Sequence, residues 1–127
     1  MKTTVTVAQM LVRLAGLIQI VLGVLFWTGN ALTLIPIHML VGTVLVLLLW
    51  VLAGIAFWAG VDRRFVVLAI VWGAIVVAFG MTQNEILPGP AHWVIQVLHL
   101  LVGLGAIGQA EGLAARIKQA PVLAAQP

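Results

Sequence analysis

Four long apolar runs constrain the fold of this chain more than any other feature. A water-soluble domain carries roughly 25% charged residues, whereas only 7% of these 127 residues are charged. Each run is about as long as the ~18 residues that distinguish a membrane-crossing helix from a buried core helix. The sequence therefore predicts one all-α domain over residues 1–127, an up-down-up-down bundle of membrane helices over about residues 12–32, 35–60, 65–81 and 91–112.

The basic residues predict the orientation of this bundle. All six fall at the chain's beginning, in the second link or after the fourth run: Lys2, Arg13, Arg63, Arg64, Arg116 and Lys118. The first and third links carry no basic residue. Because cytoplasmic flanks of membrane helices are enriched in Lys and Arg, we expect a protein of the bacterial inner membrane with both termini in the cytoplasm.

The composition excludes several classes of function. The chain has no cysteine and no serine, so it contains no thiolate metal site and no serine or cysteine nucleophile. Its basic residues are scattered at helix ends, which does not resemble a surface for nucleic acid. We expect an electron carrier or an accessory subunit more than a stand-alone enzyme.

A short motif occurs twice. The segment 28–38, TGNALTLIPIH, matches the segment 82–92, TQNEILPGPAH, at Thr, Asn, Pro and His with a constant offset of 54. This pattern predicts two copies of one helical hairpin, over about residues 12–60 and 64–117, related by an axis along the membrane normal. Pro36 and Pro90 would then begin the second and fourth spans, since Pro is tolerated in a first helical turn.

The three histidines are the candidate site residues, because ionisable side chains within membrane spans are rare and often functional. His38 and His92 occupy equivalent repeat positions on spans that face each other across a bundle. Two such imidazoles can ligate one b-type haem. The sequence thus predicts His38 and His92 as metal ligands, with a polar residue facing lipid headgroups as an equally weighted alternative for each.

His99 offers a second pairing, because HMLVG at 38–42 resembles HLLVG at 99–103. Counting from the expected cytoplasmic ends argues against it. His38 precedes Gly60 by 22 residues and His99 precedes Gly112 by 13, a mismatch in depth of roughly 13 Å. His99 could instead meet its copy in a homodimer, hydrogen-bond within the bundle, or serve as a ligand if the span boundaries differ.

Two further features concern partners. Gln96, three residues before His99, could form with it a polar pocket for a quinone head. Gly108 and Gly112 form a small-xxx-small pair that lets another backbone approach closely. We expect this pair to serve packing within the bundle first and an oligomer interface second.

Two segments carry a resemblance to known proteins. LIQIVLGVLFWTGN at 17–30 and AHWVIQVLHLLVG at 91–103 resemble small, uncharacterised four-span bacterial membrane proteins. The placement of histidines on the second and fourth spans resembles b-type cytochromes. The second resemblance implies haem b, here with one histidine on the second span and two on the fourth.

Three functional hypotheses follow. The first is a membrane haem protein that exchanges electrons with the quinone pool. The second is a non-catalytic subunit that packs against a larger respiratory or photosynthetic complex. A transporter or channel is less favoured, because no acidic residue is expected within a span to carry a coupling ion.

Overall fold

The computed structural model describes residues 1–121, and all regular structure in this part of the chain is helical. Two short 3₁₀ turns, Leu32–Leu34 and Gln83–Glu85, accompany four long helices. Each long helix, taken with its adjoining 3₁₀ turn where it has one, is long and apolar enough to cross a membrane. The prediction of four long apolar helices is therefore confirmed. The long helices are α1 (Lys2–Trp27), α2 (Ile35–Trp58), α3 (Arg63–Thr82) and α4 (Trp93–Gln119).

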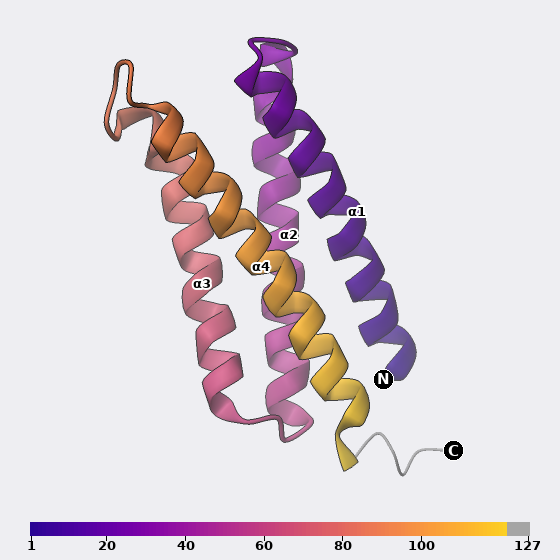
Figure 1. Ribbon diagram of the computed structural model, residues 1–127. Helices are drawn as coiled ribbons and strands as arrows, with labels where there is room; N and C mark the ends of the chain where they lie inside the picture. Colours follow the sequence, from indigo (N-terminus) through magenta and orange to yellow (C-terminus); the bar gives the residue numbers. More distant parts are fainter. Residues whose placement is uncertain (122–127) are drawn as a thin grey trace.

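The four helices form one bundle in which α2 also contacts α4, as expected for helices that face each other across a core. Figure 1 shows the turn between α2 and α3 at the lower end of the bundle. The first residues of α1 and the last residues of α4 lie at the same end. We call this the terminal end. The other two connections, residues 28–34 and 83–92, lie at the opposite end, which we call the loop end (Figure 1).

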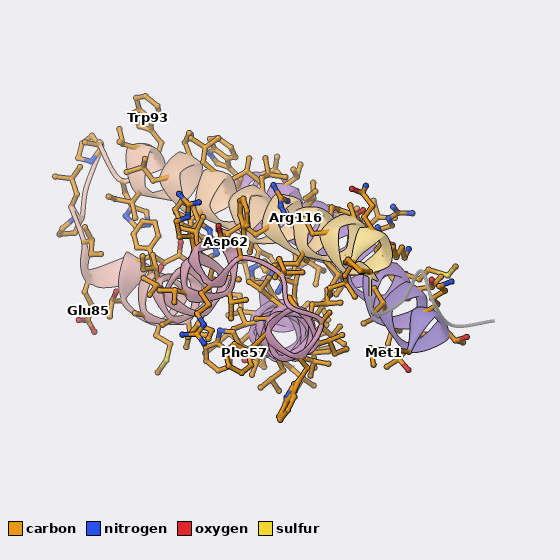
Figure 2. All side chains as sticks on the ribbon, turned by 90° about the horizontal axis from the view of Figure 1, so that it is seen from below. Met1, Phe57, Asp62, Glu85, Trp93 and Arg116 are labelled. Carbon is orange, nitrogen blue, oxygen red and sulfur yellow. The ribbon has the colours of Figure 1, made fainter. Side chains whose placement is uncertain are left out.

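The turn at the terminal end is closed by local hydrogen bonds. Gly60 adopts a positive φ of 78° after α2, a conformation that glycine tolerates best, and the next amide donates to Ala56 O at 3.0 Å. Asp62 then caps α3, because its carboxylate accepts from the backbone N–H of Arg64 at 2.9 Å. Figure 2 views the molecule from this end, with Phe57, Asp62 and Arg116 labelled.

The two connections at the loop end differ from each other. Thr28 and Thr82 both bond back to the carbonyl four residues earlier, at 3.3 and 2.8 Å. Pro36 lies in the first turn of α2, whereas Pro90 precedes the start of α4 by three residues. The equivalent repeat positions therefore share a local structure at the ends of α1 and α3 but not at the starts of α2 and α4.

A tryptophan of α2 fixes the position of α3. The Trp50 indole donates its N–H to Ile70 O at 3.2 Å and lies against Gly73, which is buried. A Cβ atom at Gly73 would meet the indole nitrogen and lie 3.1 Å from the indole Cε2. Because glycine alone leaves this space, the indole can reach the α3 backbone.

The same arrangement joins α3 to α4. Trp72 donates its indole N–H to Val102 O at 2.9 Å and packs on Gly105, where a Cβ would lie 2.8 Å from Cζ2 of the ring. In both cases the acceptor carbonyl lies three residues before the glycine. Helix α2 is therefore joined to α3, and α3 to α4, by an indole that packs on a glycine of the next helix.

The bundle is packed more tightly toward the terminal end. On α2 the buried residues begin only at Leu45, and on α3 they end at Gly73. On α4 all buried residues except Ile95 follow Val102. Side chains that are completely or almost completely buried include Val5, Val12, Val46, Leu49, Leu52 and Ile117.

Toward the loop end, inward positions such as His38, Val76 and His99 are only partly buried. In Figure 1 the connection between α1 and α2 and the connection between α3 and α4 lie well apart at this end. The half of the bundle toward which all three histidines lie is thus the less closely packed half.

Candidate functional site

The side chains of His38 and His99 meet inside the bundle. His38 is the fourth residue of α2 and His99 the seventh of α4. Their ring centroids are 6.2 Å apart and their planes are inclined by 47°. Both side chains are partly buried. The contact between α2 and α4 therefore brings together two histidines that lie 61 positions apart in the sequence.

Each of these imidazoles also contacts a phenylalanine of the adjacent helix in its own hairpin. The Phe26 ring of α1 lies edge-on to His38 with centroids 5.3 Å apart. The Phe79 ring of α3 is arranged in the same way against His99, with centroids 5.8 Å apart. Aromatic rings prefer this edge-to-face geometry. The two phenylalanines restrict the orientation of the imidazoles and cover them on their outer sides.

Gln19 of α1 adds a fifth side chain at this level. Its Nε2 donates to the backbone carbonyl of His38 at 2.7 Å, and the same amide lies against Gly42, where a Cβ would overlap it. A glycine again permits a side-chain donor to reach the backbone of the neighbouring helix. We call the set Gln19, Phe26, His38, Phe79 and His99 the histidine layer, to which all four long helices contribute.

Three polar atoms of the histidine layer are buried without a hydrogen-bond partner in the described chain: Nδ1 of His38, Nδ1 of His99 and Oε1 of Gln19. Buried polar atoms are bonded in the great majority of cases, and exceptions frequently mark ligand or water sites. Each imidazole thus has a nitrogen that the protein leaves available. The histidine layer combines two potential metal ligands with a nearby hydrogen-bond acceptor.

His92 does not take part in this contact. It lies immediately before α4, and its Nδ1 is 3.2 Å from the Ile86 carbonyl in the preceding loop. The expected pairing of His38 with His92 depended on ending the fourth span at Gly112. Helix α4 continues to Gln119, so that twenty residues follow His99 in α4 just as twenty follow His38 in α2. Counted from these ends, His38 and His99 are level.

The expected quinone residue, Gln96, lies on α4 one turn before His99 and is partly buried. Within residues 1–121 its side chain makes no hydrogen bond to protein. It is therefore near the histidine layer and retains its donor and acceptor groups.

The ligand set limits which metal centre could form. Within residues 1–121 no three His, Asp or Glu side chains gather closely enough to hold an ion, and zinc usually requires three or four protein ligands. A haem supplies nitrogen ligands of its own and would need only two from the protein. His38 and His99, with their rings in contact and their Nδ1 atoms buried without a partner in residues 1–121, are the two side chains that could provide them.

The expectation that no span contains an acidic residue is wrong, because Glu111 already falls within the expected fourth span, 91–112, and lies inside α4. Glu111 of α4 accepts two hydrogen bonds from Arg13 of α1, at 2.7 and 2.8 Å. Gln9 donates to the same carboxylate and accepts from Lys118 at 2.6 Å. This network ties α1 to α4 in the terminal half of the bundle. Its carboxylate is engaged by its neighbours, so we assign it a structural role.

The small-residue pair on α4 does not serve packing within the bundle. A Cβ at Gly108 would meet no atom within 4 Å, and one at Gly112 would meet only Arg116 of the same helix. In the described part of the chain this face of α4 therefore has no neighbouring helix.

Comparison with known proteins gives no relative from which a function could be carried over. No protein-family model, no curated protein and no solved structure matches the chain.

Proposed function

We propose that this chain is a multi-pass protein of the bacterial cytoplasmic membrane that binds a b-type haem between His38 and His99 and exchanges electrons with the quinone pool. In this proposal the four helices form an up-down-up-down bundle with both termini in the cytoplasm. The observation that carries the haem assignment is the 6.2 Å separation of two imidazoles from facing helices.

The charge distribution supports the orientation. Lys2, Arg63, Arg64 and Lys118 lie at or near the terminal end, whereas the loop-end connections carry only Glu85. Cytoplasmic flanks retain positive charge. The histidine layer then lies near the outer leaflet, since His38 is only three residues, or about 5 Å, from the start of α2.

The residues of the histidine layer have separate roles in this proposal. His38 and His99 would hold the haem iron. Phe26 and Phe79 keep water from the imidazoles and hold the rings in orientation. Gln19 fixes the backbone at His38 through its 2.7 Å hydrogen bond and so sets the height of one ligand. When bound, the haem would supply one-electron chemistry that no side chain of this protein provides.

The quinone is the proposed partner because Gln96 lies one turn from His99 with its amide unpaired within residues 1–121. An amide can donate to a quinone carbonyl oxygen. A site close to the membrane surface but within apolar helices is accessible to a lipid-soluble redox partner.

The absorption spectrum tests the haem assignment. Protein purified in mild detergent from cells supplied with a haem precursor should show a Soret band and a sharp reduced α-band. His38→Ala and His99→Ala should each remove these low-spin signals, whereas His92→Ala should retain them. Circular dichroism and gel filtration would establish that all three variants fold.

Two results would refute parts of this proposal. Absence of any haem band in the folded wild-type protein would exclude haem binding. Loss of the bands in His92→Ala, with retention in His99→Ala, would restore the pairing of His38 with His92.

A second candidate is a non-catalytic subunit of a larger respiratory or photosynthetic complex, or a homodimer. The uncovered face at Gly108 favours it, because small residues facing outward permit close approach of another membrane helix. Folded protein that lacks haem and co-purifies with other membrane proteins through this face would support that role. A Gly108→Leu variant should then lose the association without losing its helical content.

A further inference from the structure

We propose that the start of α3 binds an anionic phospholipid of the cytoplasmic leaflet, with its phosphate at Arg63 and its two acyl chains in the apolar grooves on either side. This inference rests on the membrane orientation proposed above but not on haem binding. It concerns the end of the bundle opposite to the histidine layer.

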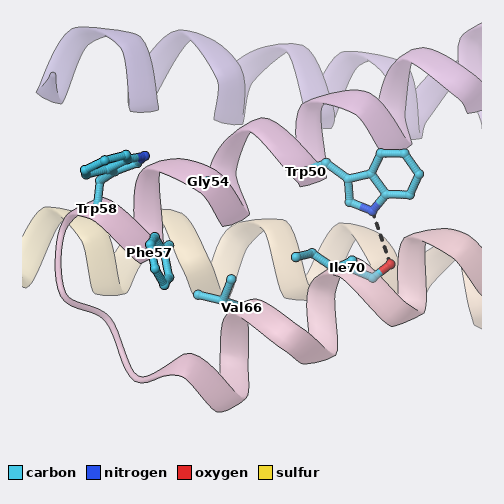
Figure 3. A pocket seen from close by; sticks show the side chains of 6 residues that line it. All are labelled: Trp50, Gly54, Phe57, Trp58, Val66 and Ile70. Carbon is cyan, nitrogen blue, oxygen red and sulfur yellow. Dashed lines mark hydrogen bonds between the residues drawn. The ribbon is translucent and has the colours of Figure 1, made fainter.

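The first groove runs between α2 and α3 and has a volume of about 430 Å³. Figure 3 shows Gly54 between Trp50 and Trp58 on α2, with Phe57 directed toward Val66 of α3. A Cβ at Gly54 would meet nothing within 4 Å, so the groove is open above the helix backbone at this point. The groove is lined by Trp50, Gly54, Phe57, Trp58, Val66 and Ile70.

The ends of this groove differ in a way that suits a lipid. Toward the middle of the bundle it is closed by Trp50, whose indole is fixed by the hydrogen bond to Ile70 O (Figure 3). At the terminal end stands Trp58, which is 82% exposed. Exposed tryptophans of this kind are typical of the level of the headgroups. An acyl chain could therefore enter from the membrane surface and extend as far as Trp50.

The second groove is an open depression between side chains on the exposed face of α3 alone. It is lined by Arg63, Arg64, Val67, Leu68 and Val71. Arg63 also contacts the first groove, because its guanidinium carbon lies 5.8 Å from the Phe57 ring centroid, within the range of a cation–π interaction. Arg63 thus lies at the start of both grooves. A lipid with two acyl chains could place its phosphate at Arg63 and one chain in each groove.

The charges at the turn distinguish Arg63 from its neighbour. Arg64 is paired with Asp62 at 2.8 Å, and its hydrogen bonds lower the pKa of the Asp62 carboxyl to about 2. That carboxyl remains ionised at neutral pH and neutralises Arg64. Arg63 has no carboxylate within ion-pair distance in residues 1–121. The turn therefore presents one uncompensated positive charge beside two apolar grooves, and an anionic lipid complements both features.

Native mass spectrometry of the detergent-solubilised protein can test this site. Phosphatidylglycerol and phosphatidylcholine with identical chains would be added in equal amounts, and the retained lipid counted. Because a basic residue near the surface favours an anionic lipid by about 1 kcal/mol, the wild-type protein should prefer phosphatidylglycerol roughly 5-fold. Arg63→Gln should reduce this preference to about 1, whereas the control Asp62→Asn/Arg64→Gln, which removes the neutral ion pair as a whole, should keep it.

Filling the groove tests the acyl-chain contact separately. Gly54→Leu should lower retention of both lipids several-fold, whereas Gly108→Leu, which also adds a side chain at an open glycine, should not. Glycerol phosphate, which lacks acyl chains, should bind neither the wild-type protein nor the Gly54→Leu variant.

Several outcomes would overturn the proposal. These are an undiminished preference in Arg63→Gln, an equal loss in Asp62→Asn/Arg64→Gln, or unchanged retention in Gly54→Leu. Binding of glycerol phosphate as tightly as the lipid would show an ordinary anion site instead. If Arg63→Gln folds poorly, Arg63→Lys must preserve the preference. None of these results depends on a haem spectrum, so the two proposals can fail independently.

Discussion

Replacing Gly73 by alanine should destabilise the protein, although alanine is normally the better helix former. A Cβ at this position would overlap the Trp50 indole nitrogen and lie 3.1 Å from Val46 Cγ1. The indole must then leave Ile70 O, to which it donates at 3.2 Å. Overpacking costs about 1–3 kcal/mol, and a lost hydrogen bond between membrane helices about 0.6 kcal/mol. Alanine returns about 1 kcal/mol of helix propensity, which leaves a net loss of about 0.6–2.6 kcal/mol.

The matched control is Gly54→Ala on α2, where a Cβ meets no atom within 4 Å. Only the propensity effect applies there, so this variant should be more stable than the wild type by up to about 1 kcal/mol. Both free energies of unfolding can be measured by titrating SDS into mixed micelles and following far-UV circular dichroism. In a Trp50→Leu background, the Gly73→Ala change should lose most of its cost.

The reasoning would be refuted by equal shifts of the same sign in the two glycine variants. It would also fail if Gly73→Ala were as costly without the Trp50 indole as with it. Either result would mean that the packing of the Trp50 indole on Gly73 does not hold α2 against α3.

Other residues give further expectations. Gly105→Ala should lower the free energy of unfolding by about 0.6–2.6 kcal/mol, because it displaces the Trp72 indole, whereas Gly108→Ala should not lower it. The pKa of the Asp62 carboxyl is lower in the folded protein than its ordinary 3.8. The ionised carboxylate therefore stabilises the fold fully above about pH 4, and this effect is lost as the pH falls through 2. The unfolding midpoint of the wild type should fall over this pH interval more than that of Asp62→Asn. Glu111→Gln should lower the thermal unfolding midpoint at neutral pH, because it leaves Arg13 without its anionic partner.

The sequence was sufficient to predict four long apolar helices, because uncharged stretches of this length are recognisable from composition alone. It did not indicate where the first helix begins. Helix α1 starts at Lys2, ten residues before the expected span. The early residues Val5, Ala8 and Val12 are buried, at the spacing of one helix face. The early segment mixes apolar residues with Lys2, Gln9 and three threonines, so an average over hydropathy does not reveal this stripe.

The pairing of the histidines was less accessible to sequence reasoning. His38 and His99 stand in similar pentapeptides, which was the correct indication of their contact. The competing estimate of depth assumed that Gly112 ends the fourth span. Helix α4 continues past Gly112 because the residues that follow, LAARIKQ at 113–119, are mostly strong helix formers. Contacts like that of Gln19 with Gly42 depend on the rotation of two helices, which no spacing along one chain reveals.

The uneven packing of the bundle has a consequence for how its backbone opens. Amide groups among the buried residues near Leu49 and Ile117 can exchange their protons only when much of the core separates, whereas those beside His38 and His99 lie where few contacts must break. Local opening free energies follow the density of buried contacts. A large planar group could therefore enter the loop-end half after the chain has folded, while the terminal half remains a closed base that keeps the four helices in register.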